Sequence, residues 1–132
     1  MKYTYTAVLS PIEDGSGYYC RVPDISGCVT SGKNLSDAIA MITDAANGCL
    51  CVLEDEGIPI PVPSAQADIE HGANDIITVI QLDTIAHRAA NDKRAVRKNV
   101  SLPAWMSRLA DQRHINCSQV LQDGLMKILE TV

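Results

Sequence analysis

Apolar and polar residues alternate in short segments at the start of the chain. Residues 2–9 place bulky or apolar side chains at odd positions and mostly polar ones at even positions, which is the period of a half-buried strand. Residues 18–22 and 28–31 also have strand composition, and Gly, Pro and Asp mark turns between the three segments. The pattern predicts a three-stranded meander joined by tight turns.

A helical period follows the third strand. Apolar residues recur at helical spacing over residues 35–53. Asn34 is a good N-cap, and Asp37 stands three residues on, at the capping-box position. Gly48 lies inside the apolar pattern at a cost of about 1 kcal/mol relative to Ala. We therefore expect packing on the sheet to hold this helix, and residues 54–57 to end it.

The middle of the chain contains proline and a second strand signal. Pro at every second position of residues 58–63 excludes a central strand, so an extended edge segment is predicted, followed by a short helix near 65–70. Residues 76–82 are β-branched and apolar on both faces, which favours a strand inside the sheet. Residues 84–95 are rich in Ala, Asn and charge, and they are predicted to form a linker or a surface helix.

The C-terminal residues combine one strand pattern with two helix patterns. Residues 96–102 alternate strictly over their second half, and Pro103 both stops a strand and suits the first turn of a helix. Helices are predicted over 104–113 and after the N-cap Asn116, which has Gln119 at the capping-box position. The outward side chains of the strand would be Arg97, Asn99 and Ser101.

One strand and two helices cannot close a core, because a lone strand leaves both of its edges unpaired. A symmetric dimer solves this by pairing the two strands antiparallel, and such a ribbon fits the major groove of B-DNA. Arg97, Asn99 and Ser101 are then predicted to contact bases, since Arg can hold guanine and Asn adenine. The start of the second helix would hold a DNA phosphate. The predicted phosphate contacts are Asn116, Cys117 and Ser118.

Charge divides between the two ends of the chain. The 132 residues carry a net charge of −5. Residues 1–83 hold three Lys/Arg against twelve Asp/Glu, a net −9, and residues 84–132 hold eight against four, a net +4. The basic end suits nucleic acid and the acidic end a basic protein. An apolar content of 46% argues against a disordered chain. No apolar run predicts a membrane helix, and the start is unlike a signal peptide, so a cytoplasmic protein without a membrane partner is expected.

Catalytic and metal chemistry find little support in the sequence. The five Cys and three His lack the spacing of a metal site, so we expect free thiols, no metal and no cofactor. A metal-dependent nuclease needs converging carboxylates, yet residues 2–10 contain no acid. Asp24, in a turn, and Asp83, after the last strand, are the acids that such an enzyme would use. We expect a protein that is not an enzyme.

Two sets of motifs, taken in order, resemble a known family. Residues 17–28 (GYYCRVPDISGC), then Thr30 and Gly32, then residues 56–61 (EGIPIP) resemble the body of HicB antitoxins. Residues 99–105 (NVSLPAW) and 115–122 (INCSQVLQ) resemble the HicB subgroup that carries a ribbon-helix-helix DNA-binding module. The chain departs from that pattern at two positions. His114 replaces the usual Gly between the helices, so a left-handed residue is expected there, and Gly124 replaces Ala.

The resemblance implies an α+β protein in three parts. Residues 1–83 would form a partial, inactive RNase H-like sheet with one main helix, residues 84–95 a linker, and residues 96–132 a ribbon-helix-helix module for dimerisation and DNA binding. It implies a type II antitoxin that neutralises a HicA-like, basic, mRNA-cleaving toxin and represses its own operon through double-stranded operator DNA, as a homodimer or higher even oligomer. The predicted toxin contacts are Tyr18, Tyr19, Arg21 and Asp24.

Two features of these predictions stay open. Tyr and Arg are enriched in binding hot spots, but core packing explains at least one of the tyrosines equally well, and turn chemistry explains Asp24. The alternative function is an orphan ribbon-helix-helix repressor whose N-terminal domain binds a small ligand. A short basic neighbouring gene product that is toxic alone would discriminate between the two functions.

Overall fold

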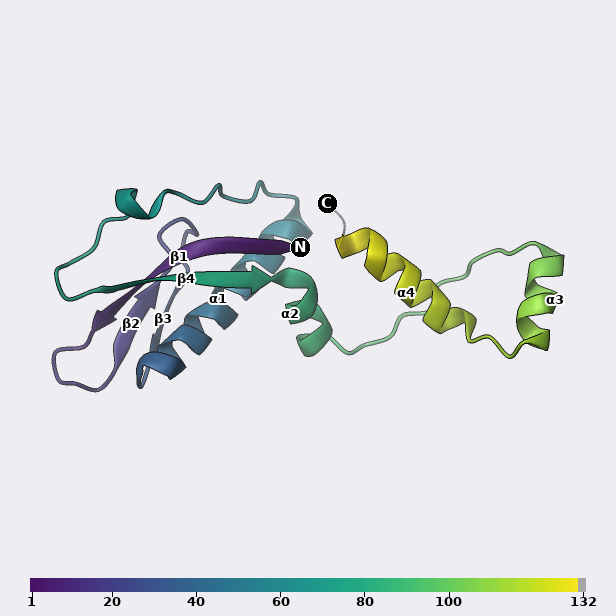
Figure 1. The fold of residues 1–132 in the computed structure, drawn as a ribbon, viewed down its shortest axis with the longest axis horizontal. Coiled ribbons are helices and arrows are strands. Elements are labelled where there is room, and N and C mark those ends of the chain that lie inside the picture. The colour runs from purple at the N-terminus through teal and green to yellow at the C-terminus, as the bar shows by residue number, and fades with distance from the viewer. Residues whose placement is uncertain (131–132) are drawn as a thin grey trace. The chain divides into compact units, whose positions relative to one another are not determined.

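The computed structural model describes residues 1–130, which divide into two compact units (Figure 1). The N-terminal unit spans Lys2–Asn91, and the C-terminal unit begins at Asp92. The predicted module over residues 96–132 extends past the described residues by its last two positions.

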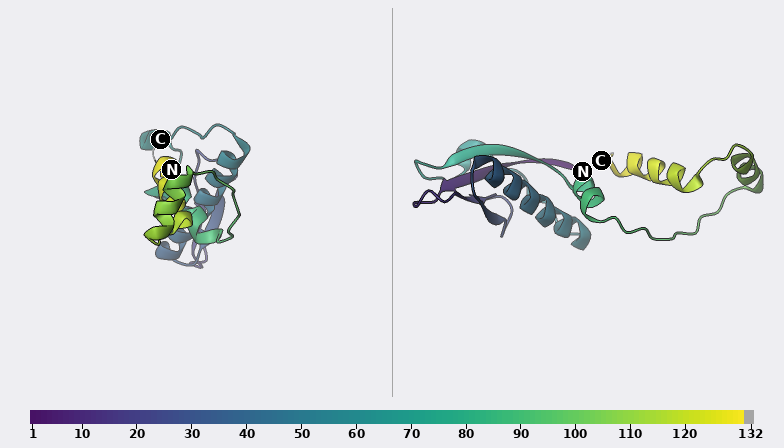
Figure 2. Two further views of the ribbon diagram at one scale, coloured as in Figure 1. Left: turned by 90° about the vertical axis from the view of Figure 1, so that its right-hand side faces the viewer. Right: turned by 90° about the horizontal axis from the view of Figure 1, so that it is seen from below.

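The N-terminal unit is a four-stranded antiparallel sheet with a long helix on one face (Figure 2). The strand order is β3-β2-β1-β4, so the first strand is central. Leu9 of that strand pairs with Cys20 on one side and with Ile76 on the other. The elements are β1 (Lys2–Pro11), β2 (Tyr18–Arg21), β3 (Val29–Gly32), α1 (Leu35–Glu56), the 3-10 turn η1 (Gln66–Asp68), β4 (Ile76–Asp83) and α2 (Thr84–Asn91).

The predicted helix α1 is confirmed, with its expected ends. Asn34 Oδ1 accepts the Asp37 N–H at 2.9 Å, and Asp37 Oδ2 accepts the Lys33 N–H at 2.8 Å. Gly57 ends the helix with a φ of 68°, a left-handed cap that glycine adopts without strain. One face of α1 is fully buried against the sheet and forms the core with it. The buried residues of that face are Ala38, Ile42, Ala46 and Leu50.

Glycine permits the close approach of α1 to β3. A Cβ built on Gly32 would lie 2.4 Å from the backbone of Ala38, a distance that real Cβ atoms do not reach. By length and composition alone, α1 could also cross a membrane, contrary to the expectation that no segment would. Its buried face and its sheet contacts are those of a core helix.

The position of β4 differs from the prediction. Residues 76–82 were expected inside the sheet, but β4 pairs with β1 alone and forms an edge. The apolar composition of a strand indicates how far its two faces are buried. It does not indicate whether both of its edges are hydrogen-bonded to neighbouring strands. Even the faces are unequal, since Val79 is 53% exposed while Ile80 is buried. The Pro-rich residues 58–63 also form no strand; they lie near the sheet, where the Tyr5 hydroxyl donates to the Pro61 carbonyl.

Two alternatives were predicted for residues 84–95, a linker or a surface helix, and a helix is formed over residues 84–91, which belong to the N-terminal unit. Residues 84–91 form α2, which is held on α1 by polar contacts. Arg88 binds Glu54 at 3.2 Å and Asp55 at 2.9 Å, and Glu54 also accepts the hydroxyl groups of Thr84 at 3.1 Å and of Tyr3 at 2.8 Å. Burial, followed by the bond to Glu54, raises the pKa of Tyr3 to about 12. The unit therefore ends at Asn91 rather than at residue 83.

The C-terminal unit contains the two predicted helices, α3 (Ala104–Gln112) and α4 (Cys117–Glu130). The strand predicted over residues 96–102 is not formed, since residues 92–103 have no regular secondary structure. A strand exists by hydrogen bonding to a neighbour, and the single chain offers this segment none. The prediction had assigned that neighbour to a second copy of the chain.

Candidate DNA- and partner-binding surfaces

The three residues predicted to contact bases lie at exposed positions in the segment before α3. Arg97, Asn99 and Ser101 are all exposed, so the segment presents donors and acceptors without competing buried partners. Nearby Arg94 differs, because its guanidinium pairs with Asp92 at 2.8 Å and lowers the pKa of that carboxyl group to about 2. The apolar alternates of the segment are exposed as well: Val96, Val100 and Leu102.

The turn between the two helices has the predicted geometry. His114 has a φ of 54°, the left-handed conformation expected where the family usually has Gly. This turn closes α3 through a bond from the Ile115 N–H to the Ala110 carbonyl at 3.0 Å. Asn116 then caps α4 by accepting the Gln119 N–H at 3.1 Å. The full capping box is not formed, because the Gln119 side chain binds Asp123 at 2.8 Å instead.

The start of α4 offers donors to an anion. The N–H groups of Cys117 and Ser118 belong to the first helical turn, where helix geometry supplies no intrahelical acceptor. They also stand at the positive end of the helix dipole. Asn116 uses its carbonyl oxygen as the cap and keeps its Nδ2 donor. All three residues are exposed, so this end of α4 can accept a phosphate group.

None of the described residues 92–130 is buried. Both helices are amphipathic, and their apolar faces lie in solvent: Trp105, at the start of α3, is 58% exposed, and Leu125, in the middle of α4, is 45% exposed. Soluble proteins rarely leave such continuous apolar surface without a partner. The exposed apolar residues of the helices include Trp105, Met106, Leu109, Val120, Leu121, Leu125, Met126, Ile128 and Leu129.

The four predicted toxin contacts do not form one patch. Tyr18 packs partly buried against the core, whereas Tyr19, next in the strand, lies on the opposite face and is 62% exposed. Arg21 donates to the Glu70 carbonyl at 2.9 Å. Asp24 accepts the Ser64 N–H at 2.8 Å and the Ser64 hydroxyl at 2.6 Å, which is a structural role for this turn carboxylate. Of the four, Tyr19 is the most available to a partner.

Asp24 and Asp83, the two acids that a nuclease would use, both accept hydrogen bonds within the N-terminal unit. Asp24 binds Ser64, and Asp83 Oδ1 accepts the Ala86 N–H at 3.1 Å at the start of α2. Within the described residues, no group of three or more His, Cys, Asp or Glu side chains could hold a metal ion.

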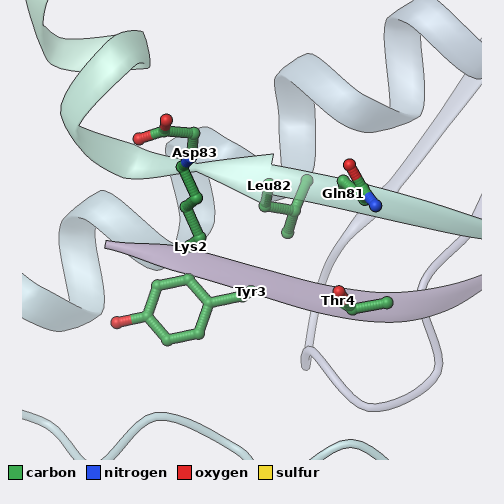
Figure 3. A pocket seen from close by; sticks show the side chains of 6 residues that line it. All are labelled: Lys2, Tyr3, Thr4, Gln81, Leu82 and Asp83. Carbon is green, nitrogen blue, oxygen red and sulfur yellow. The ribbon is translucent and has the colours of Figure 1, made fainter. Parts of the chain in front are cut away.

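A pocket of about 480 Å³ lies over the ends of β1 and β4 (Figure 3). Cross-strand neighbours supply its polar groups, since Lys2 pairs with Asp83 and Thr4 with Gln81 in the strand register. Figure 3 shows the Lys2 side chain extending from β1 toward Asp83. Tyr3 and Leu82 complete the lining. This is a place in the N-terminal unit where a small polar ligand could sit.

A family model for "HicB_like antitoxin of bacterial toxin-antitoxin system" matches residues 5–123. The match takes in both units and nearly the whole chain. This protein belongs to the HicB-like antitoxin family. A comparison with functionally characterised protein sequences found no match.

Solved structures support the same fold for this HicB-like antitoxin. A chain of a toxin–antitoxin complex from Streptococcus pneumoniae is 21% identical, with a TM-score of 0.62 over 96% of this chain and 99% of that one. The antitoxin HicB of Burkholderia pseudomallei is 22% identical, with a TM-score of 0.53 over 96% of both chains. A chain of the HicA3 and HicB3 toxin–antitoxin complex covers 61% of this chain and 99% of its own length at 21% identity and a TM-score of 0.50.

Proposed function

We propose that this HicB-like antitoxin neutralises a small, basic, mRNA-cleaving toxin of the HicA type through its N-terminal unit and represses its own operon through its C-terminal unit. It would act in the cytoplasm, as a binding protein rather than an enzyme. The observation that carries this proposal is the contrast between an acidic unit with its own core and a basic unit with none.

The C-terminal unit supports a dimer. The apolar faces of α3 and α4 and the unpaired segment before them require the same thing, a second copy that supplies both a core and a strand partner. Pairing residues 96–102 of two chains antiparallel would bury Val100 and Leu102 against the four helices. Arg97, Asn99 and Ser101 would then face outward from a two-stranded ribbon, in position to contact bases in the major groove. The chain would assemble as a dimer or as a larger even oligomer.

The start of α4 would place the ribbon on DNA. Phosphate contacts fix the register of a protein on the duplex, and base contacts supply its specificity. The exposed donors of Asn116, Cys117 and Ser118 suit the first task. The C-terminal unit from residue 92 onward carries seven Lys/Arg against four Asp/Glu, a net +3, which favours a polyanion.

The N-terminal unit supports a basic protein partner. Residues 2–91 carry four Lys/Arg against twelve Asp/Glu, a net −8, so this unit repels nucleic acid and attracts a positively charged protein. Two of the similar structures come from toxin–antitoxin complexes, one of them a complex of HicA3 with HicB3.

Co-expression with the product of the adjacent gene tests the proposal. We expect the tagged full-length chain to co-purify with a small basic protein that arrests growth when expressed alone, and the complex to retard a fragment of its own promoter. A homo-oligomer that binds the promoter but no protein would contradict the antitoxin function. It would favour a repressor with a small ligand, for which the pocket between Lys2 and Asp83 is the first place to search.

A further inference from the structure

Helix α1 exposes apolar side chains beside the face that it buries against the sheet. Met41 is 43% exposed and Val52 is 53% exposed, while the core-facing residues of the helix are fully buried. Ala45, which is partly buried against the core, and Gly48 lie between them at helical spacing, so the four residues form one row along the helix. We call this row, Met41-Ala45-Gly48-Val52, the outer row. It extends over about 16 Å, at 1.5 Å per residue.

The outer row is exposed because no other element of the N-terminal unit packs over that side of α1. Figure 2 shows α1 against one side of the sheet, and no other element of residues 2–91 crosses its outer side. Helix α2 lies alongside and binds Cys51 and Glu54 through hydrogen bonds, and the N–H of Asp83, at the end of β4, donates to Asn47. Met41 and Val52 of the outer row stay exposed beside these contacts. The apolar composition of α1 therefore exceeds what its own core requires.

Gly48 is not explained by packing within the chain. A Cβ built on this residue meets no atom within 4 Å. Glycine inside a helix costs about 1 kcal/mol relative to alanine, and no close neighbour in the unit compensates for that cost. A flat position between two larger apolar side chains does allow another protein to approach the helix backbone closely.

The charges around the outer row select the kind of partner. Helix α1 contains five acidic residues and no Lys or Arg. Asp44 and Asp55 flank the outer row. Their side chains are 75% and 64% exposed, and within the chain Asp44 lies 3.7 Å from His87 and Asp55 lies 2.9 Å from Arg88. The opposite, outer face of the sheet also has exposed apolar residues, Tyr19 among them, but it carries Lys2 and Arg21. An apolar row with an acidic rim fits a partner that presents apolar side chains surrounded by Lys and Arg.

We propose that the outer row of α1 is the docking surface for the basic toxin, an inference that rests on the proposed antitoxin function. Met41 and Val52 insert between apolar side chains of the toxin, whose backbone or small residues lie over Gly48. Asp44 and Asp55 pair with basic residues at the rim. Binding there would also explain why Met41 and Val52 are apolar at exposed positions.

The test uses the full-length chain and the small basic protein encoded by the adjacent gene, with affinity measured by titration calorimetry. Val52→Arg and Gly48→Leu should each weaken toxin binding by about 30-fold or more, as for a hot-spot residue. Neither substitution enters the core, so promoter binding should match that of the wild type. The thermal unfolding transition of Val52→Arg should match it too, and that of Gly48→Leu should be equal or higher, because leucine favours the helix over glycine. Tyr19→Arg tests the outer face of the sheet, where the sequence predicted a toxin contact. Val79→Arg, an exposed apolar residue of that face outside the predicted contacts, is the matched control and should change affinity less than about threefold.

The outcomes separate this inference from the function beneath it. If the wild-type chain binds the basic protein, and Val52→Arg and Gly48→Leu bind it equally well, the docking surface is wrong and the antitoxin function stands. A loss confined to Tyr19→Arg would move the interface to the outer face of the sheet, and would also overturn the inference. If the wild-type chain binds no basic protein, both proposals fall. If Val52→Arg unfolds, Asp44→Lys, at a largely exposed position, decides in its place, and affinity equal to that of the wild type would refute the surface.

Discussion

The two units of this chain differ in where their stability comes from. The N-terminal unit buries a continuous core between α1 and the sheet, with Tyr5, Leu9, Ile42 and Leu50 each at most 1% exposed. The described residues of the C-terminal unit bury nothing. The same chain therefore joins a unit with a core of its own to a unit whose core, in the function that we propose, a second copy of the chain completes. The stability of the C-terminal unit should therefore depend on protein concentration, and the stability of the N-terminal unit should not.

The largest effect is expected from a charged residue in the core that the proposed dimer of C-terminal units would form. Leu121→Asp should abolish dimerisation, because assembly would bury an unpaired carboxylate at a cost of several kcal/mol. Sedimentation analysis should give a monomer, promoter binding should be lost, and the N-terminal unit should remain folded. Gln122→Asp is the matched control on the next residue of the same helix and should remain dimeric. A dimer in Leu121→Asp would mean that the N-terminal units also associate, or that α4 pairs through another face.

The complementary change is a cavity in the N-terminal core. Ile42 is fully buried, and Ile42→Ala should lower the free energy of unfolding of this unit by about 2–5 kcal/mol. Denaturant melts of the wild type and the variant at several protein concentrations measure this. The transition of the N-terminal unit should shift by the same amount at each concentration. A shift that grows on dilution would show that its core, too, depends on assembly.

How far the sequence predicts this fold depends on how local each signal is. The cap at Asn34, the stop at Gly57, the left-handed His114 and the cap at Asn116 are formed by neighbours in the chain, and all four were predicted correctly. The edge position of β4 was missed, because strand order depends on segments about 70 residues apart. Helix α2 was read in part as linker, since the contacts of Arg88 with Glu54 and Asp55 join residues more than 30 positions apart.

The candidate binding surfaces also differ in how far local sequence predicts them. The exposure of Arg97, Asn99 and Ser101 agrees with the sequence prediction, although their contact with bases remains a proposal. The predicted strand that carries them needs a second chain, so the single chain does not show it. The outer row of α1 was missed entirely. Met41 and Val52 are apolar residues off the predicted core stripe, and that departure from amphipathicity was the available signal.

A base-contact variant should have a smaller effect than the loss of the dimer. Arg97→Ala should weaken binding to the specific promoter site by about 1–3 kcal/mol and leave nonspecific DNA binding, dimerisation and toxin binding nearly unchanged. Competition gel shifts with specific and random DNA measure the ratio. Arg94→Ala is the comparison, because Arg94 is paired with Asp92 within its own chain. Equal specificity in Arg97→Ala and the wild type would argue against the ribbon.

The smallest expected effect concerns the hydrogen bond from the Tyr3 hydroxyl of β1 to Glu54 of α1. The pKa of Tyr3 is raised from 10.0 to about 12, so the folded state holds this proton more tightly than the unfolded state does. That contribution to stability is complete below pH 10 and is lost as the pH rises from 10 to about 12.

Tyr3→Phe removes this titrating group together with its bond to Glu54. The variant should be less stable than the wild type at pH 8, and the difference between the two should shrink as the pH approaches 12. Denaturant melts across this range measure the difference. Tyr19→Phe, on an exposed tyrosine of the neighbouring strand, should follow the wild type at every pH. If the difference between Tyr3→Phe and the wild type stayed constant up to pH 12, Tyr3 would not be the group that couples proton binding to the folding of the N-terminal unit.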